Sequence, residues 1–436
     1  MDTFAKGYFS ASPYCRGAHV ALLLFMAGFL SGCAIFSSSG ADDSDPSQES
    51  VEKIEGDPVL IRAREEGDGF VTEGVDAEEI FQRAYYAYQS RQYDEAAEYY
   101  QLIIDHFSKS RFYMASLYNG GLANEYLGEW SQAAENFETL IEEFPGTQEA
   151  FNAKFRLSNA WYELGEYRQV EQFLMELLLR DDLEHIDRVE AHNQRGRALL
   201  KLQEWTDAEN SFNNVLESNR RADPGDRLGD DHRFIVLAHF GVGQSFHGRM
   251  TDIELVLPSE RMREDLYSKA EYHQRAQGAY IRALREHHHH WSVAAGFHIG
   301  RLYEDFYMDI FSAEIPDHLT DEQIALYFEE LRKEIELLMD RALRVYERNL
   351  SFSQRVARGE EAEQWVEETA IRLARMRALL DDPLVQRRAE ELVVQERDID
   401  ELWDISYYAR VHVEDAVEAA AKAAEESPQE EEVARR

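Results

Sequence analysis

The chain has 436 residues, and its 85 acidic side chains outnumber its 46 Lys and Arg side chains, which gives a formal net charge of −39. This charge argues against nucleic acid as a partner, because phosphate binding requires basic patches. Hydrophobic residues at 44% and aromatic residues at 12% exclude a wholly disordered chain. The length allows two or three domains or one long repeat array.

Residues 1–32 are predicted to be a lipoprotein signal peptide. Lys6 and Arg16 precede an apolar run of 11 residues over 20–30, which is too short to span a bilayer. The run leads into Leu30-Ser31-Gly32-Cys33, which resembles a bacterial lipobox. The resemblance implies that Cys33 is acylated and becomes the first residue after cleavage. The alternative is a plain secretory signal with a chance cysteine.

Cleavage before Cys33 would also remove Cys15, so no thiol would remain for a disulfide or a thiolate metal site. The residue after Cys33 is Ala34 rather than Asp. By resemblance to Gram-negative lipoproteins, this implies an anchor in the periplasmic leaflet of the outer membrane. Residues 33–76 are rich in acidic side chains and lack a helical apolar period, which predicts a flexible tether. A short ordered segment around Val59-Leu60-Ile61 is the alternative.

A repeat with a period near 37 residues begins at residue 77. Aromatic residues recur at Tyr93, Trp130, Tyr167 and Trp205, with spacings of 37, 37 and 38. Three further columns lie at fixed distances from these aromatics, two of mostly small residues and one of large apolar residues. Their members are Ala84, Gly121, Ser158 and Gly196; Ala96, Ala133, Val170 and Ala208; and Tyr100, Phe137, Leu174 and Phe212. The columns predict two antiparallel helices per unit, with small residues where the helices approach and large residues between hairpins.

This pattern resembles the tetratricopeptide repeat (TPR), four units of which would cover residues 77–221. The match is strongest from Leu117-Tyr118-Asn119-Gly120-Gly121 through Glu143-Phe144-Pro145. The period and the turn Phe144-Pro145-Gly146-Thr147 are similar to extracytoplasmic TPR lipoproteins, such as the BamD family of outer-membrane assembly lipoproteins. The resemblance implies an all-α fold, a TPR-type solenoid of helical hairpins.

The C-terminal half is predicted to extend this array. Residues 222–382 are interpreted as degenerate helical hairpins with elongated, irregular helices. Gly300 with Tyr303, and Ala276 with Tyr280, are predicted to repeat the small and large columns. Residues 383–436 are predicted to form a C-terminal helix followed by a polar tail. The helical segments expected before it are 233–249, 259–286, 291–313, 320–350 and 359–380.

The TPR resemblance implies a groove for peptides or proteins, lined by the first helix of each unit. Aromatic rings, Asn amides and Arg guanidinium groups suit an extended peptide, because amides satisfy its backbone and Arg binds a carboxylate. The alternative is that these side chains pack on neighbouring helices or face water. The candidate groove residues are Phe81, Gln82, Tyr85, Tyr88, Tyr118, Asn119, Phe155, Arg156, Asn159, Tyr162, Asn193 and Arg197.

Two local clusters contain metal-ligating residue types without the spacing of a metal site. Residues 287–290 are four consecutive histidines, which would point in different directions on a helix and are interpreted as a solvated turn. The aspartates of residues 223–231 lack the spacing and the closing Glu of an EF-hand loop. Sequence motifs for nucleotide binding and for a serine nucleophile are absent, so no cofactor, metal or catalytic residue is predicted. An enzyme hidden in residues 222–382 is the least favoured alternative.

The predicted function is a lipid-anchored periplasmic scaffold, not an enzyme, that binds envelope proteins or extended peptide segments in outer-membrane assembly. The alternative is a pilotin-like or secretion- or motility-system accessory lipoprotein. The acidity leaves three explanations open, which are a saline habitat, a basic partner and drift in composition. Anionic lipid would repel the acidic surface, so the acyl chains on Cys33 are predicted to provide the membrane anchor.

Overall fold

The computed structural model describes residues 59–66, 69–230, 232–286, 288, 290–315, 319–357 and 359–381. The chain divides into two compact units, Met1–Leu164 and Gly165–Arg436. The predicted signal peptide, Cys33 and the predicted C-terminal helix over 383–424 lie outside the described residues. None of the described helices combines the length and the apolar character needed to cross a bilayer.

An antiparallel β-hairpin precedes the helices of the first unit. Strand β1 (Leu60–Glu66) pairs with strand β2 (Gly69–Val75), and Leu60 lies opposite Val75. Val75 is buried, and Leu60 packs against the apolar cluster that contains it. The segment 33–76, for which a flexible tether was predicted, thus contains a β-hairpin over residues 60–75, longer than the short ordered segment considered around Val59-Leu60-Ile61.

Five helices complete the described part of the first unit, and each packs against the next in sequence. Asp76 and Thr147 cap the first and last of them, because each side chain accepts a hydrogen bond from the backbone N–H three residues later, at 2.8 and 3.2 Å. The third helix ends at Gly128, whose φ of 76° favours glycine. The helices are α2 (Ala77–Gln89), α3 (Tyr93–His106), α4 (Tyr113–Leu127), α5 (Trp130–Glu143) and α6 (Gln148–Glu163).

The repeat columns form the core of these hairpins. Ala96 and Ala133 of the small column and Tyr100 and Phe137 of the large column are fully buried. Gly121 lies directly against the Phe137 ring, since a Cβ at Gly121 would stand 2.6 Å from two of its carbon atoms. The predicted alternation of small and large residues is therefore confirmed in the first unit.

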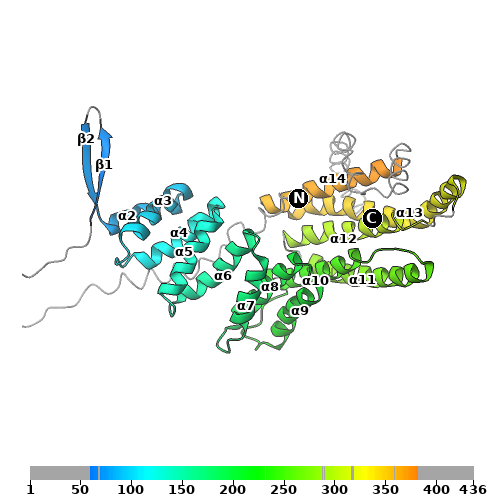
Figure 1. The fold of residues 1–436 in the computed structure, drawn as a ribbon, viewed down its shortest axis with the longest axis horizontal. Helices are drawn as coiled ribbons and strands as arrows, with labels where there is room; N and C mark the ends of the chain where they lie inside the picture. The colour runs from blue at the N-terminus through cyan, green and yellow to red at the C-terminus, as the bar shows by residue number, and fades with distance from the viewer. Residues whose placement is uncertain are drawn as a thin grey trace, which may run out of the picture. The chain divides into compact units, whose positions relative to one another are not determined.

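Eight helices form the described part of the second unit, and each again packs against the next (Figure 1). The even-numbered helices also contact one another in the order α8, α10, α12 and α14, so they form one layer. The elongated helices predicted for the C-terminal half are present, since α11 has 27 residues and α13 has 36. The helices are α7 (Tyr167–Leu178), α8 (His185–Lys201), α9 (Trp205–Arg221), α10 (Arg233–Thr251), α11 (Ser259–Arg285), α12 (Trp291–Phe311), α13 (Asp321–Val356) and α14 (Glu360–Asp381).

One aromatic ring joins three helices at the start of the second unit. Phe212 of α9 is fully buried between Gly196 of α8 and Gly241 of α10. A Cβ at Gly196 would stand 2.7 Å from the ring, and a Cβ at Gly241 would stand 2.3 Å from it. Both glycines are therefore required by close approach rather than by backbone conformation.

The C-terminal helices use the same contact over longer sequence distances. A Cβ at Gly243 would stand 2.6 Å from the Tyr280 ring, and a Cβ at Gly300 would stand 2.2 Å from the Tyr346 ring. Gly300 is thus covered by Tyr346 of α13 rather than by a residue of its own helix. In both contacts the ring comes from the following helix. Because these helices are longer, the glycine and the ring are further apart in sequence than in the N-terminal repeats.

Candidate protein-interaction surface

The predicted groove residues of α2 and α4 are partly accessible. Gln82 is exposed, and Tyr85, Tyr88 and Asn119 are half-buried. All four belong to the first helices of their repeat units, where the TPR resemblance places the groove. Tyr88 also packs against the apolar clusters of the first unit, so only part of its ring is accessible.

Two other predicted groove residues of the same helices belong to the core instead. The Phe81 ring stacks on Phe112 with centroids 4.9 Å apart and meets the edge of Tyr100 at 5.8 Å. The Tyr118 ring packs edge-on against Phe137 at 6.0 Å. These contacts fit the alternative of packing on neighbouring helices, although both side chains remain half-buried rather than fully buried.

The predicted residues of α6 are more deeply placed. Phe155, Asn159 and Tyr162 are buried, at 8%, 5% and 9% exposure. Arg156 is half-exposed and donates a 2.9 Å hydrogen bond to Glu125 Oε2 on α4. Burial raises the pKa of the Glu125 carboxyl to about 6, although the Arg156 charge opposes the shift.

Two acceptors beside this ion pair lack donors. Glu125 Oε1 and Asn159 Oδ1 are buried, and neither accepts a hydrogen bond from any described residue. A buried acceptor without a donor costs about 1–3 kcal/mol, so such atoms mark places where a ligand's N–H group would be stabilising.

The predicted residues of the fourth repeat, on α8 in the second unit, have structural roles or little accessibility. Asn193 is 1% exposed, and its amide donates to the carbonyl oxygens of Val189 and Phe234, both at 3.2 Å. Arg197 is 7% exposed. Asn193 thus links α8 to α10, and the prediction that it contacts a peptide is wrong because its donor group is used within the fold.

Two exposed tyrosines of the first unit are not among the predicted groove residues. Tyr86 is 68% exposed and Tyr126 is 41% exposed. Their helical phase provides a signal, because Ala84 and Ala87 are buried and leave Tyr86 on the opposite side of α2. Tyr126 lies near the end of α4, where its ring stacks on Tyr93 with centroids 4.1 Å apart and an interplanar angle of 2°.

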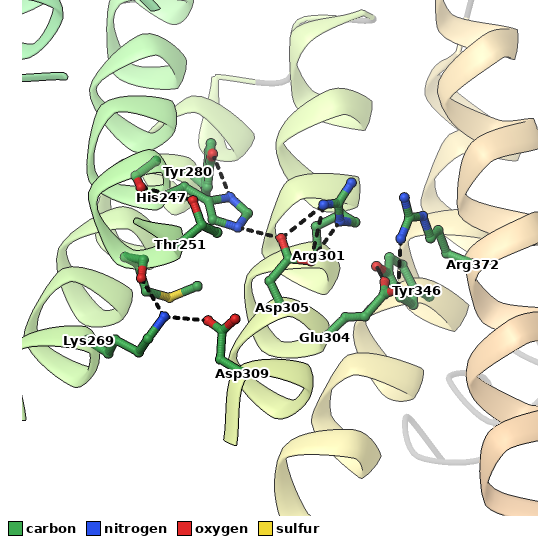
Figure 2. Close-up of polar contacts among 12 residues, drawn as sticks. His247, Thr251, Lys269, Tyr280, Arg301, Glu304, Asp305, Asp309, Tyr346 and Arg372 are labelled. Carbon is green, nitrogen blue, oxygen red and sulfur yellow. Dashed lines mark hydrogen bonds and ion pairs between the residues drawn. The ribbon is translucent and has the colours of Figure 1, made fainter. Parts of the chain in front are cut away.

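The second unit contains a buried polar network centred on α12 (Figure 2). Asp305 accepts a 3.0 Å hydrogen bond from Arg301 and lies 2.9 Å from His247 Nε2 on α10. The pKa of Asp305 is held well below its usual range by the Arg301 charge, against the opposing effect of burial. His247 also meets the hydroxyl of Tyr280 at 3.3 Å, which extends this contact to α11.

A neighbouring carboxylate joins α12 to the two helices that follow. Glu304 is 1% exposed and accepts hydrogen bonds from the Tyr346 hydroxyl and, at 2.8 Å, from Arg372. Burial and the Glu304 charge hold the pKa of Tyr346 well above its usual range. The phenol therefore stays protonated and donates to Glu304 at any physiological pH.

The third contact of the network is a lysine without solvent exposure. Lys269 of α11 donates to Asp309 of α12 and to the Met250 carbonyl of α10, both at 2.6 Å. Burial raises the pKa of Asp309 to about 6, with the Lys269 charge opposing. Because the charges of the network pair with one another across five helices, we interpret it as a structural device rather than a reaction centre.

No group of three or more His, Cys, Asp or Glu side chains within the described ranges is placed to hold a metal ion. In the histidine run, residues 287 and 289 lie outside the described residues, and His290 packs against the Trp291 ring at 4.4 Å.

The comparisons with known proteins found one family model that matches part of the chain, and similar solved structures. Residues 115–147 match the family model of the tetratricopeptide repeat. A tetratricopeptide repeat protein from Parabacteroides merdae ATCC 43184 is 15% identical, with 67% of this chain and 98% of that chain covered and a TM-score of 0.34. The apo form of RapI is 11% identical, with 78% and 99% covered and a TM-score of 0.40. A search of curated proteins found no match.

Apart from the β1–β2 hairpin, the described part of the chain is therefore a helical array of the TPR type, with a TPR unit at residues 115–147. This class of fold is a scaffold for protein–protein interaction, and its members are in general not enzymes.

Proposed function

We propose that this chain is a lipid-anchored scaffold in the periplasmic leaflet of the outer membrane, where it binds envelope proteins or extended peptide segments during envelope assembly. The TPR-type fold supports the binding role. The sequence Leu30-Ser31-Gly32-Cys33 after an apolar run supports the anchor, and the similarity to BamD-type lipoproteins supports the envelope role.

One observation carries the binding proposal. Gln82, Tyr85, Tyr88 and Asn119 remain partly accessible on the first helices of two consecutive repeats. Amide groups can pair with a peptide backbone, and tyrosines combine apolar area with a hydroxyl, which suits an extended segment.

Site-directed photo-crosslinking in intact cells tests the proposal. Gln82→p-benzoylphenylalanine is expected to yield a discrete crosslinked partner, because this position is exposed on α2. The same replacement at Glu98 and at Glu135, which are exposed on the second helices α3 and α5, serves as the matched control. Crosslinks from the control positions alone would move the binding surface away from the first helices. Identification of a secretion or motility component as the partner would favour an accessory lipoprotein over an assembly scaffold.

The anchor is tested separately by Cys33→Ser. The native protein is expected to carry acyl mass by intact-mass spectrometry and to fractionate with outer membranes, whereas the variant is expected in the soluble periplasmic fraction. A native protein without acyl mass would refute the anchor while leaving the scaffold role open.

A further inference from the structure

Helix α13 has a solvent-exposed side that contains two large apolar residues. Leu326 and Leu337 are 57% and 53% exposed, whereas Phe328, Ile335 and Met339 on the same helix are buried. Leu326 and Leu337 are 11 residues apart, which is about three helical turns, so they lie on one side of α13. Each is two residues away from a buried side chain, which places this side opposite the core.

The charge of α13 changes sign along the helix. Residues 321–340 contain seven acidic and two basic side chains, whereas residues 341–356 contain four basic and one acidic. The second segment thus has the opposite sign to the chain as a whole, whose net charge is −39. The helix dipole favours basic residues only within the last turn, so it accounts for Arg355 but not for the arginines at 341, 344 and 348.

These three arginines lie on the same side of α13 as the leucines. Arg341, Arg344 and Arg348 follow Leu337 by four, seven and eleven residues, which keeps them on one side of the helix, and all three are exposed. Arg348 has no ion-pair partner among the residues that the structure describes. Glu330 precedes Leu337 by seven residues and is exposed as well. We define the outer face of α13 as Leu326, Glu330, Leu337, Arg341, Arg344 and Arg348.

The ion pairs that this side forms within α13 are exposed to solvent. Arg344 lies 3.5 Å from Asp340, and Lys333 donates to Glu329 and Glu330 at 3.2 and 2.9 Å. The side chains of these pairs are between 46% and 64% exposed. Exposed pairs of this kind contribute little to stability, so they can give way to pairs with another molecule.

Two copies of the outer face of α13 are complementary to each other when the helices run antiparallel. With a two-fold axis at Leu337, the two Leu337 side chains meet, and Glu330 of each copy lies level with Arg344 of the other, about 10 Å from the axis. Arg341 and Arg348 of the other copy are then within about one turn of Glu330. A parallel pair would place acidic beside acidic and basic beside basic residues, so the charges select the antiparallel arrangement.

From the exposed leucines, the reversal of charge along the helix and the unpaired Arg348, we propose that the outer face of α13 binds the same face of a second copy of this chain in an antiparallel, two-fold symmetric dimer. The Debye length is about 8 Å at physiological ionic strength, so repulsion between the distant acidic surfaces of the two copies is largely screened, whereas contacts across the interface are not. This inference goes beyond the proposed scaffold function and requires neither the lipid anchor nor an envelope partner.

Cysteine crosslinking tests the arrangement on the full-length Cys15→Ser, Cys33→Ser protein, which has no other cysteine. In this background, Leu337→Cys places a thiol at the two-fold axis and is expected to yield a disulfide-linked dimer on mild oxidation. Leu326→Cys is the matched control, because it is equally exposed but its two copies lie about 33 Å apart in the antiparallel dimer. The control is expected to crosslink at least tenfold less.

Sedimentation velocity at about 150 mM salt tests the charges. The parent protein is expected to sediment as a dimer, and Arg344→Glu should raise its dissociation constant about tenfold or more, because it places Glu opposite Glu330 at two symmetric contacts. Adding Glu330→Arg to Arg344→Glu should restore the dissociation constant to within about threefold of the parent value, because the pair is then reversed rather than removed. Arg263→Glu, at an exposed position of α11, changes the net charge by the same amount and should leave the dimer unchanged.

A parent protein that stays monomeric at concentrations on the order of 100 μM would overturn the proposal. Equal crosslinking of Leu326→Cys and Leu337→Cys would overturn the antiparallel arrangement, because a parallel pair or random collision would then explain the disulfides. Failure of Glu330→Arg to rescue Arg344→Glu would overturn the pairing across the interface. None of these results affects the scaffold function, which the crosslink from Gln82 tests separately.

Discussion

Neighbouring helices are held in register by different kinds of contact in α2–α6 and in α10–α14. In the first group, alanines and glycines admit the rings of Tyr100 and Phe137, and the ion pair of Arg156 with Glu125, which joins α6 to α4, is partly exposed. In the second group, glycine-to-ring contacts persist, but Lys269, Glu304 and Asp305 also pair with charges on neighbouring helices. The comparison indicates that lengthened helices, which have lost the regular period, are aligned by charge as well as by shape.

The largest expected difference comes from breaking the polar network at Glu304. Glu304→Ala would remove the buried acceptor of the Tyr346 hydroxyl and of the partly buried Arg372, and should cost about 3–5 kcal/mol of unfolding free energy. Glu367→Ala, at an exposed position of α14, should cost less than about 0.5 kcal/mol. Chemical denaturation with hydrogen exchange by region would measure both. A loss at Glu304 no greater than that at Glu367 would mean that the network contributes no stability.

Lowering the pH should change the stability of the two units in opposite directions. Burial lowers the pKa of His192, His239 and His273 in the second unit to about 4. The unfolded chain protonates these groups near pH 6.5, so the stability they contribute at pH 7 is lost as the pH falls from 6.5 toward 4. The raised pKa of Asp309 acts in the opposite direction between about pH 6 and 4. Because three histidines oppose one carboxyl group, the second unit is expected to lose roughly 4 kcal/mol of unfolding free energy between pH 7 and pH 5.

The first unit should become more stable as the pH falls. The pKa of Glu125 is raised to about 6, so its folded state binds a proton before the unfolded state does and gains stability as the pH falls from 6 to 4.5. Hydrogen exchange of the full chain at pH 7 and pH 5, corrected for intrinsic rates, would resolve the two units. Parallel destabilisation of both would contradict the assignment of these pKa shifts.

A smaller effect is expected from overpacking the first unit. Ala133 is fully buried, so Ala133→Leu should cost about 1–3 kcal/mol. Glu135→Leu, two residues away on the exposed side of α5, should cost less than about 0.5 kcal/mol. The midpoints of thermal unfolding would compare them, and equal losses would show that the register of the repeat columns is misassigned.

The smallest effect concerns a helix end. Gly128→Ala places a Cβ at a φ of 76° and should cost about 1 kcal/mol. Gly146→Ala has nothing within 4 Å of the new Cβ and a φ outside the left-handed region, so it should be neutral or slightly stabilising. Denaturant midpoints suffice for this pair. If Gly128→Ala leaves the denaturant midpoint unchanged, the left-handed conformation of Gly128 does not limit the stability of α4.

The fold was predictable where local spacing determines contacts. The columns through Ala133 and Phe137 repeat at a period that the sequence displays, and their burial follows from it. The hairpin at residues 60–75 was not predicted, and only a short ordered segment around Val59-Leu60-Ile61 was considered, because the acidic composition outweighed these apolar residues. The pairing of Gly300 with Tyr346 was missed because the two residues are 46 positions apart on helices of unequal length.

The candidate surface was less predictable than the fold. A repeat column predicts the helix on which a residue lies and the side of that helix. It did not predict that the Asn193 amide bonds to the Phe234 carbonyl, because the two residues are 41 positions apart in sequence. The ionic contacts of Lys269 and Glu304 also join residues far apart in sequence, at separations of 40 and 68. Such pairings depend on tertiary approach, which residue types at a given spacing do not encode.

The Phe212 ring has a consequence for how this chain can diverge. Because Gly196 and Gly241 cover its two sides, neither glycine can acquire a side chain while the ring is kept. During evolution, Phe212 must be replaced by a smaller side chain before Gly196 or Gly241 can be replaced by a larger residue. Homologous sequences should therefore show these three positions changing together, with a smaller side chain at position 212 wherever 196 or 241 is not glycine.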